Sequence, residues 1–143
     1  MAKKEMDLRF GKFGTVSFTS TTKVNDFMDR LEQGNISGTK CKSCGKVYFP
    51  PRADCYNCLG KEMEWFDVTG TGKLLTYSKL EYAPVGFEND LPYSIALLDF
   101  GEYKIFGRLA SDITDDEIKV GMEMKVVPNE LPSGQLNYVF QKA

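Results

Sequence analysis

The sequence lacks histidine altogether and contains no long apolar run. Without histidine, the chain cannot form a Ser–His–Asp or Cys–His catalytic group of its own, and it lacks the side chain that most often moves protons at neutral pH. No apolar stretch approaches the about 20 residues that span a bilayer. The lysines near the N-terminus are not followed by the apolar segment of a secretion signal, so we expect a cytoplasmic protein. If the chain takes part in catalysis, we expect the reacting groups to belong to another protein.

Basic and acidic residues are unevenly divided along the 143 residues. Residues 1–65 hold 11 Lys and Arg against 8 Asp and Glu, a balance of +3, whereas residues 66–143 hold 7 against 12, a balance of −5. The chain is 42% hydrophobic and 27% charged, which is ordinary for a folded protein and excludes a disordered or collagen-like chain. This length fits one domain, or two small modules that share an interface.

Four cysteines form the pattern C-x2-C-x10-C-x2-C. Each short turn directs two sulfurs to one point, and two such turns complete the four ligands of a tetrahedral Zn²⁺ site. A full thiolate shell leaves no position for water or substrate, so we expect the metal to be structural. Two disulfides or a redox-active CxxC pair are the alternatives, and thiolates also accept iron. The predicted ligands are Cys41, Cys44, Cys55 and Cys58.

An amphipathic helix is predicted before the cysteines. Thr22 is the expected N-cap and Gly34 the expected end, and apolar residues between them recur at i, i+3, i+4 and i+7. A stripe of this kind packs either on its own domain or on another protein, and the pattern favours neither. Phe27 and Leu31 are therefore candidate contacts to a partner protein. The stripe is formed by Val24, Phe27, Met28 and Leu31.

Strands are predicted over most of the remaining sequence, so the expected fold class is mainly β. Residues 8–19 partly alternate apolar and polar, as a strand or hairpin does, and residues 47–52 read as a short strand stopped by prolines. After residue 64, short apolar segments alternate with turns, and Thr114 and Glu117 form the capping box of one helical turn. This order matches a small OB-type barrel. The later strands are expected at 65–68, 74–82, 93–100, 103–109, 122–128 and 136–141.

This arrangement resembles the zinc-ribbon/OB-fold family of acyl-CoA-associated proteins, long catalogued as a domain of unknown function. The most specific likeness is the Phe-Pro-Pro-Arg stretch at residues 49–52, between the two cysteine pairs. Leu59 stands where glycine is common in this family. The resemblance implies an N-terminal strand and helical segment over residues 1–37, a rubredoxin-like zinc ribbon over 38–62 and an OB-fold domain over 63–143.

Family members look like small non-catalytic partners of thiolase-fold enzymes, which hold the reactive cysteine and histidine. The resemblance implies an accessory subunit without activity of its own, in a hetero-oligomer that forms or cleaves a carbon–carbon bond in an acyl-CoA. A narrower resemblance is to the small thiolase subunit of anaerobic aromatic (toluene-type) degradation. The alternative function is binding of single-stranded nucleic acid, which the acidic second half of the chain opposes. An independent hydrolase or CoA-transferase ranks last, because no nucleophile–base spacing is visible.

Several residues are candidates for contact with a CoA ester. Cations near the cysteines suit its phosphates, and compensation of the thiolate charge is their alternative role. An aromatic residue in the loop 83–91 and another in the following strand are candidates for lining the acyl or pantetheine path. The alternative is a plain surface loop with its phenylalanine turned inward. The candidates are Lys42, Lys46, Arg52, Phe87 and Tyr93.

Overall fold

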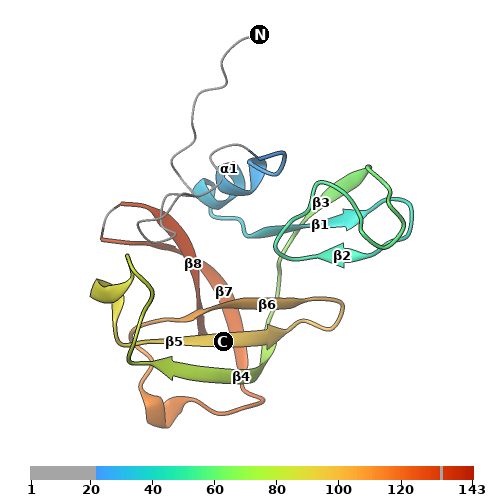
Figure 1. The fold of residues 1–143 in the computed structure, drawn as a ribbon. Helices are drawn as coiled ribbons and strands as arrows, with labels where there is room; N and C mark the ends of the chain where they lie inside the picture. Colours follow the sequence, from blue (N-terminus) through green and yellow to red (C-terminus); the bar gives the residue numbers. More distant parts are fainter. Residues whose placement is uncertain (1–21, 133) are drawn as a thin grey trace.

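The computed structural model describes residues 22–132 and 134–143, and the structural statements below concern these residues. A short helix precedes a three-stranded sheet, and a five-stranded closed barrel follows (Figure 1). The predicted fold class, mainly β with a zinc ribbon and an OB-type barrel, is confirmed. The strand or hairpin predicted at residues 8–19 lies outside the described residues. No helix within them is long and apolar enough to cross a membrane.

Helix α1 spans Asp26–Glu32 and begins later than the sequence predicts. The hydroxyl of Thr22, the expected N-cap, accepts a hydrogen bond from the N–H of Val24 at 3.3 Å. Thr22 therefore organises a turn before the helix, whose N-cap is Asn25. The predicted end is confirmed, because Gly34 adopts a φ of 89° and its N–H bonds the carbonyl of Leu31.

The first sheet carries the cysteine turns. Strands β1 (Ser37–Cys41), β2 (Val47–Tyr48) and β3 (Met63–Asp67) pair in the order β2-β1-β3, all antiparallel. Strand β3 pairs with β1 over five residues, so the strand predicted at 65–68 lies in the sheet of the ribbon and not in the barrel. A Cβ at Gly38 would lie 2.5 Å from the carbonyl oxygen of Tyr48, so β1 requires glycine there.

The barrel closes around one apolar core. Its strands are β4 (Gly72–Leu80), β5 (Tyr93–Asp99), β6 (Lys104–Leu109), β7 (Glu123–Glu130) and β8 (Leu136–Lys142). They run in the order β4-β5-β6-β8-β7, and pairing of β4 with β7 closes the ring. Short 3-10 turns lie at η1 (Glu88–Asp90) and η2 (Asp115–Glu117). The capping box predicted at Thr114 and Glu117 is present. The buried core consists of Leu74, Ala96, Leu98, Ile105, Leu109, Ile118, Met124 and Phe140.

The helix and two ring contacts join the ribbon to the barrel. The ring contacts are Phe49 with Tyr138 and Phe66 with Tyr103. Met28 and Leu31 are buried, with Leu31 only 2% exposed, and they pack with Ile36 against residues of both the ribbon and the barrel. The apolar stripe thus covers its own chain, the first of the two alternatives. Leu31 has no surface left for a partner, and Phe27 is half-buried. The partly buried residues in this contact are Phe27, Phe49, Val68, Val126, Leu136 and Tyr138.

Candidate functional site

Two turns of the ribbon bring four cysteine sulfurs together. The Sγ atoms of Cys41 and Cys58 lie 3.5 Å apart, those of Cys44 and Cys55 lie 3.6 Å apart, and all four fall within 4.8 Å of one another. Gly45 adopts a φ of 76°, and its N–H bonds the carbonyl of Cys41 at 2.9 Å, which turns the first knuckle back on itself.

The donor set fits a tetrahedral zinc ion. Four sulfurs at about 2.3 Å from one Zn²⁺ lie about 3.8 Å from each other, close to the separations of 3.5 Å and 3.6 Å in the structure. A disulfide needs an S–S distance of about 2.05 Å, and all four cysteines are free thiols. The two-disulfide alternative is therefore wrong.

Hydrogen bonds around the sulfurs favour charge on some thiols and oppose it on others. Burial raises the pKa of Cys55, but the Tyr48 hydroxyl 3.0 Å from its Sγ and two backbone N–H groups outweigh burial and lower it to about 6. The N–H of Gly60 favours charge on Cys58, but sharing of protons with the other three thiols raises its pKa to about 12. Four crowded thiolates need a cation among them. A bound Zn²⁺ supplies that charge and holds the sulfurs deprotonated.

The three predicted cations of the ribbon do not act alike. The ammonium of Lys46 lies 4.7 Å from the ring centroid of Tyr56, and the guanidinium of Arg52 lies 5.4 Å from it. The Tyr56 hydroxyl and nearby cysteine sulfurs raise the pKa of Lys46. Lys46 and Arg52 thus share a contact with the ring of Tyr56, whereas Lys42 is exposed on the first knuckle.

The two predicted aromatic residues hold an arginine. The guanidinium of Arg108, on β6, lies 3.9 Å from the ring centroid of Tyr93 and 5.4 Å from that of Phe87. It also bonds the carboxylate of Asp90 at 3.2 Å, and both charged side chains are largely buried. Sequence reasoning missed Arg108 and Asp90, because a strand distant in sequence brings the cation to the loop.

The five CoA candidates therefore lie on two separate surfaces. Tyr93 lines a groove of about 700 Å³ beside η1, whereas Lys42, Lys46 and Arg52 lie on the ribbon. Figure 1 places η1 and the ribbon on opposite sides of the molecule. The structure does not bring the five residues into one site.

Comparison with known proteins shows which family the chain belongs to. Residues 28–64 match the family described as ChsH2, rubredoxin-like zinc ribbon domain, and residues 65–128 match ChsH2, C-terminal OB-fold domain. A DUF35 domain-containing scaffold protein of Pyrococcus furiosus is 33% identical over 100 residues, which cover 70% of this chain and 73% of that protein. The chain belongs to the ChsH2/DUF35 family.

Other DUF35 relatives differ in the roles that their names give. A DUF35 domain-containing scaffold protein of Methanocaldococcus jannaschii is 39% identical over 94 residues, 64% of this chain and 66% of that protein. The benzoylsuccinyl-CoA thiolase subunit BbsA of Thauera aromatica is 32% identical over 90 residues, 59% of this chain and 61% of its own. The solved structure of an Ltp2-ChsH2(DUF35) aldolase shares the fold, with a TM-score of 0.72 at 20% identity over 87% of this chain and 98% of that one.

The zinc-ribbon match and the cluster of four thiols together support a structural zinc site in this DUF35 chain. Cys41, Cys44, Cys55 and Cys58 would hold the ion. Because four thiolates fill a tetrahedral shell, the ion organises the ribbon and leaves no position for a substrate.

Proposed function

We propose that this DUF35 protein is a non-catalytic accessory subunit of a thiolase-fold enzyme, and that it supports the site at which that enzyme binds an acyl-CoA. Membership of a family whose relatives include subunits of benzoylsuccinyl-CoA thiolase carries the proposal. Other relatives are named scaffold proteins. The BbsA matches make aromatic acyl-CoA thioesters the first substrates to test.

The chemistry of the chain supports this division of labour. The sequence has no histidine, so a thiolase-type reaction would take its proton-moving groups from the partner. The four cysteines suit a closed zinc shell and not an attacking thiolate. The ribbon packs on the barrel through Phe49 against Tyr138 and Phe66 against Tyr103. A ribbon and a barrel packed in this way can support an enzyme surface without contributing a reacting atom.

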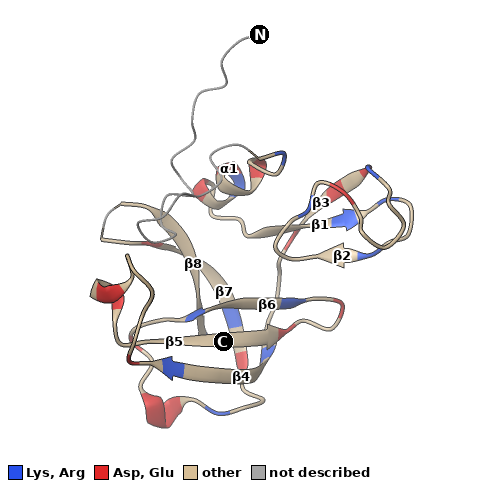
Figure 2. Cartoon of the chain, in the orientation of Figure 1, with Lys and Arg blue, Asp and Glu red and all other residues tan. Residues whose placement is uncertain are grey.

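Charge argues against the alternative, binding of single-stranded nucleic acid. Such binding depends on a positive surface that releases counterions from the phosphates. Residues 66–143 carry a balance of −5. Acidic residues gather at η1 and η2 of the barrel, away from the ribbon (Figure 2). An OB barrel that binds single strands would present cations and aromatic rings on its binding face.

Co-expression with a thiolase-fold protein encoded by the adjacent reading frame tests the proposal. We expect the two chains to co-elute in size-exclusion chromatography, and acyl-CoA turnover to require both of them. A chain that elutes alone and leaves the turnover of the enzyme unchanged would overturn the proposal. Submicromolar, salt-sensitive binding of a single-stranded oligonucleotide would favour the alternative instead.

A further inference from the structure

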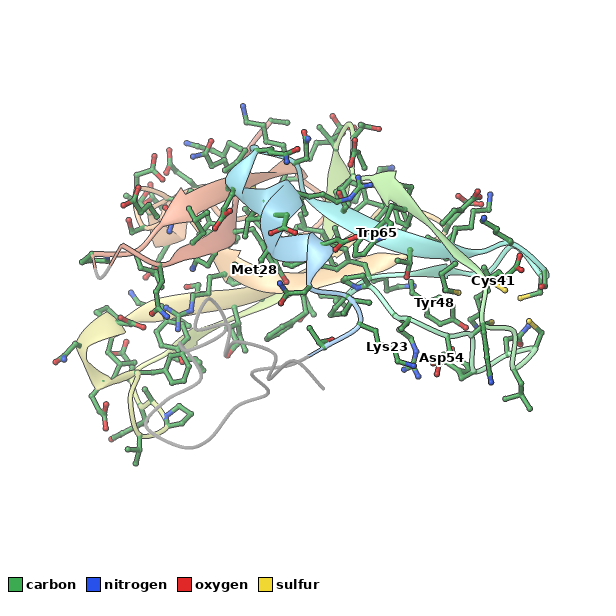
Figure 3. All side chains as sticks on the ribbon, turned by 90° about the horizontal axis from the view of Figure 1, so that it is seen from above. Lys23, Met28, Cys41, Tyr48, Asp54 and Trp65 are labelled. Atoms are coloured by element: carbon green, nitrogen blue, oxygen red, sulfur yellow. The ribbon has the colours of Figure 1, made fainter. Side chains whose placement is uncertain are left out.

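The groove of about 700 Å³ beside η1 lies where an OB fold takes its ligands. In this fold, ligands bind on the face of the second and third barrel strands and on the loops beside it. Strands β5 and β6 hold that place in this barrel, and the ends of both line the groove together with residues of η1. Figure 3 shows the yellow segment that holds η1 at the left and the cysteine turns, marked by Cys41, at the right. The groove is therefore separate from the metal site.

Carboxylates outnumber cations in the lining of this groove by four to two. Both cations are already paired with an acid of the groove. The ammonium of Lys79 lies 2.6 Å from the carboxylate of Asp115, and the guanidinium of Arg108 lies 3.2 Å from that of Asp90. These two pairs cancel, so the groove keeps a surplus of negative charge.

The surplus resides on Asp112 and Glu130. Both are exposed and line the groove, and neither carboxylate has an ion-pair or hydrogen-bond partner in the described part of the chain. The acids of the groove do not converge on one point, because the cysteine cluster is the only group of metal-binding side chains in the described residues that could hold one ion. Carboxylates spaced in this way suit several separate cations, whereas one metal ion needs its oxygen ligands close together.

The uncharged lining suits a polypeptide. The side chain of Asn129 donates to the side-chain oxygen of Asn137 at 2.8 Å, which leaves the Nδ2 group of Asn137 and the side-chain oxygen of Asn129 to bond a ligand. A peptide offers a donor and an acceptor at nearly every residue. Ile113 and Leu131 add apolar surface for the hydrocarbon stems of lysine or arginine.

A nucleic acid fits this groove poorly. The surplus of carboxylates repels phosphates. A base binds by stacking on an aromatic face, but Tyr93 is the only aromatic residue among the described residues that line the groove. One face of its ring is covered by the guanidinium of Arg108, 3.9 Å from the ring centroid.

We propose that this groove binds a segment of a partner protein that carries several lysine or arginine side chains. The unpaired carboxylates complement the cations of such a segment, and the two asparagines bond its backbone. The volume of about 700 Å³ is within the range of sites that enclose a ligand. The inference rests on the proposed function only for the identity of the partner, the thiolase-fold enzyme.

Acetyl-tetralysine amide is the probe, titrated into the full-length, zinc-loaded, ¹⁵N-labelled protein while the backbone amide signals are followed by NMR. We expect saturable shifts at groove residues such as Ser111 and Asn137, and an affinity that weakens with salt. Spermine carries the same charge as this peptide but has no peptide groups. It should bind about fivefold more weakly, because the hydrogen bonds to the peptide backbone are lost.

Two double variants separate the groove from net charge. Asp112→Asn with Glu130→Gln removes both unpaired charges and should weaken tetralysine binding about tenfold, since two ion pairs are lost. Glu102→Gln with Glu123→Gln removes the same charge at exposed residues outside the groove and should leave the affinity unchanged. Zinc content and circular dichroism establish that both double variants fold.

The inference is overturned if tetralysine gives no saturable shifts, if the shifts centre on the ribbon, or if both double variants lose affinity equally. Spermine binding as tight as that of tetralysine would overturn it too, because the groove would then recognise charge without a peptide. The outcome for the proposed function is separate. Tetralysine binding in the groove without co-elution of the enzyme would sink the proposed function alone, and co-elution without tetralysine binding would sink this inference alone.

Discussion

The ring of Phe49, in the zinc ribbon, packs edge-on against the ring of Tyr138, in β8 of the barrel, with centroids 5.7 Å apart. Phe27 from the helix meets Phe49 at 6.2 Å, so rings from helix, ribbon and barrel converge. The Tyr138 hydroxyl donates to the carbonyl of Phe106 at 2.8 Å, and burial raises the pKa of Tyr138 to about 12, which keeps it a neutral donor. Phe49 is thus central to the contact that sets the ribbon on the barrel.

Replacing Phe49 with alanine should loosen this junction. We expect Phe49→Ala to lower the free energy of unfolding by about 2–3 kcal/mol, because it leaves a void between three elements. Urea denaturation measures the loss, and zinc content should stay at one ion per chain because the ligands are untouched. Tyr82→Ala, at a side chain that is 91% exposed, is the control and should change stability by less than about 0.5 kcal/mol. Equal losses in the two variants would contradict a structural role for Phe49.

Removal of zinc should destabilise the ribbon and leave the barrel folded. The barrel has a core of its own, whereas the buried residues of the knuckle region are Cys41, Tyr48 and Cys55. A chelator should therefore abolish amide protection in β1 and β2, and leave it in β5 and β6. Hydrogen exchange measures this, and one equivalent of zinc should restore protection. Loss of protection throughout the barrel would show that the two modules fold as one unit.

The hydroxyl of Tyr48 supports the metal ligand Cys55. It lies 3.0 Å from the Cys55 Sγ and donates to it when the sulfur is a thiolate. Partners of this kind tune ligand basicity, and their loss weakens metal affinity by about 10- to 100-fold. Competition with a chromophoric chelator should show that loss for Tyr48→Phe. Tyr77→Phe, at an exposed tyrosine of β4, should bind zinc as the parent chain does. Unchanged affinity in Tyr48→Phe would mean that the hydroxyl only fills space.

Features that depend on neighbouring residues were predicted from the sequence better than contacts between segments far apart in the chain. The capping box of Thr114 and Glu117 and the stop at Gly34 depend on neighbours within four residues, and both are present. The pairing of β3 with β1 depends on residues more than 20 apart, which no local pattern encodes.

The candidate sites also divide into local features, which the sequence predicts, and contacts between distant segments, which it does not. The cysteine spacing predicted the metal cluster, since each pair is fixed by its own turn. The clamp of Arg108 by Phe87 and Tyr93 joins a loop, β5 and β6, and only the closed barrel brings them together. Lys23, which precedes the helix, and Lys61, which follows the second cysteine pair, likewise line one hollow on the ribbon. Side chains that meet through tertiary packing leave no spacing signal.

Leu59 carries local backbone strain next to a metal ligand. Its φ is 59°, which glycine adopts readily and which costs a side chain about 1–2 kcal/mol. The side chain is 80% exposed, so little packing is lost on removing it. We expect Leu59→Gly to stabilise the zinc-loaded protein by up to about 1 kcal/mol, visible as a higher melting temperature. Val120→Gly, also at an exposed residue but without a positive φ, should destabilise the protein. A lower melting temperature for Leu59→Gly would contradict the strain.

The charge of the Glu117 carboxylate should make the stability of the barrel depend on pH in the acidic range. Hydrogen bonding by the Lys142 ammonium, followed by the N–H and hydroxyl of Thr114, lowers the pKa of this carboxyl to about 2. An ordinary glutamate in the unfolded chain has a pKa of about 4.3. Since the folded state binds the proton less tightly, the carboxylate adds stability that is complete above the unfolded pKa and is lost as the pH falls toward 2.

The variant Glu117→Gln should therefore melt below the parent protein at pH 6, and the gap should narrow steadily as the pH falls from about 5 toward 2. Thermal melts of both proteins across this range measure the gap. Loss of zinc in acid affects both proteins alike, so their difference isolates the carboxylate. Glu123→Gln, at an exposed residue of β7, should show a small gap that does not vary in this way. A gap for Glu117→Gln that stays constant with pH would mean that Glu117 stabilises the turn through its shape and not through its charge.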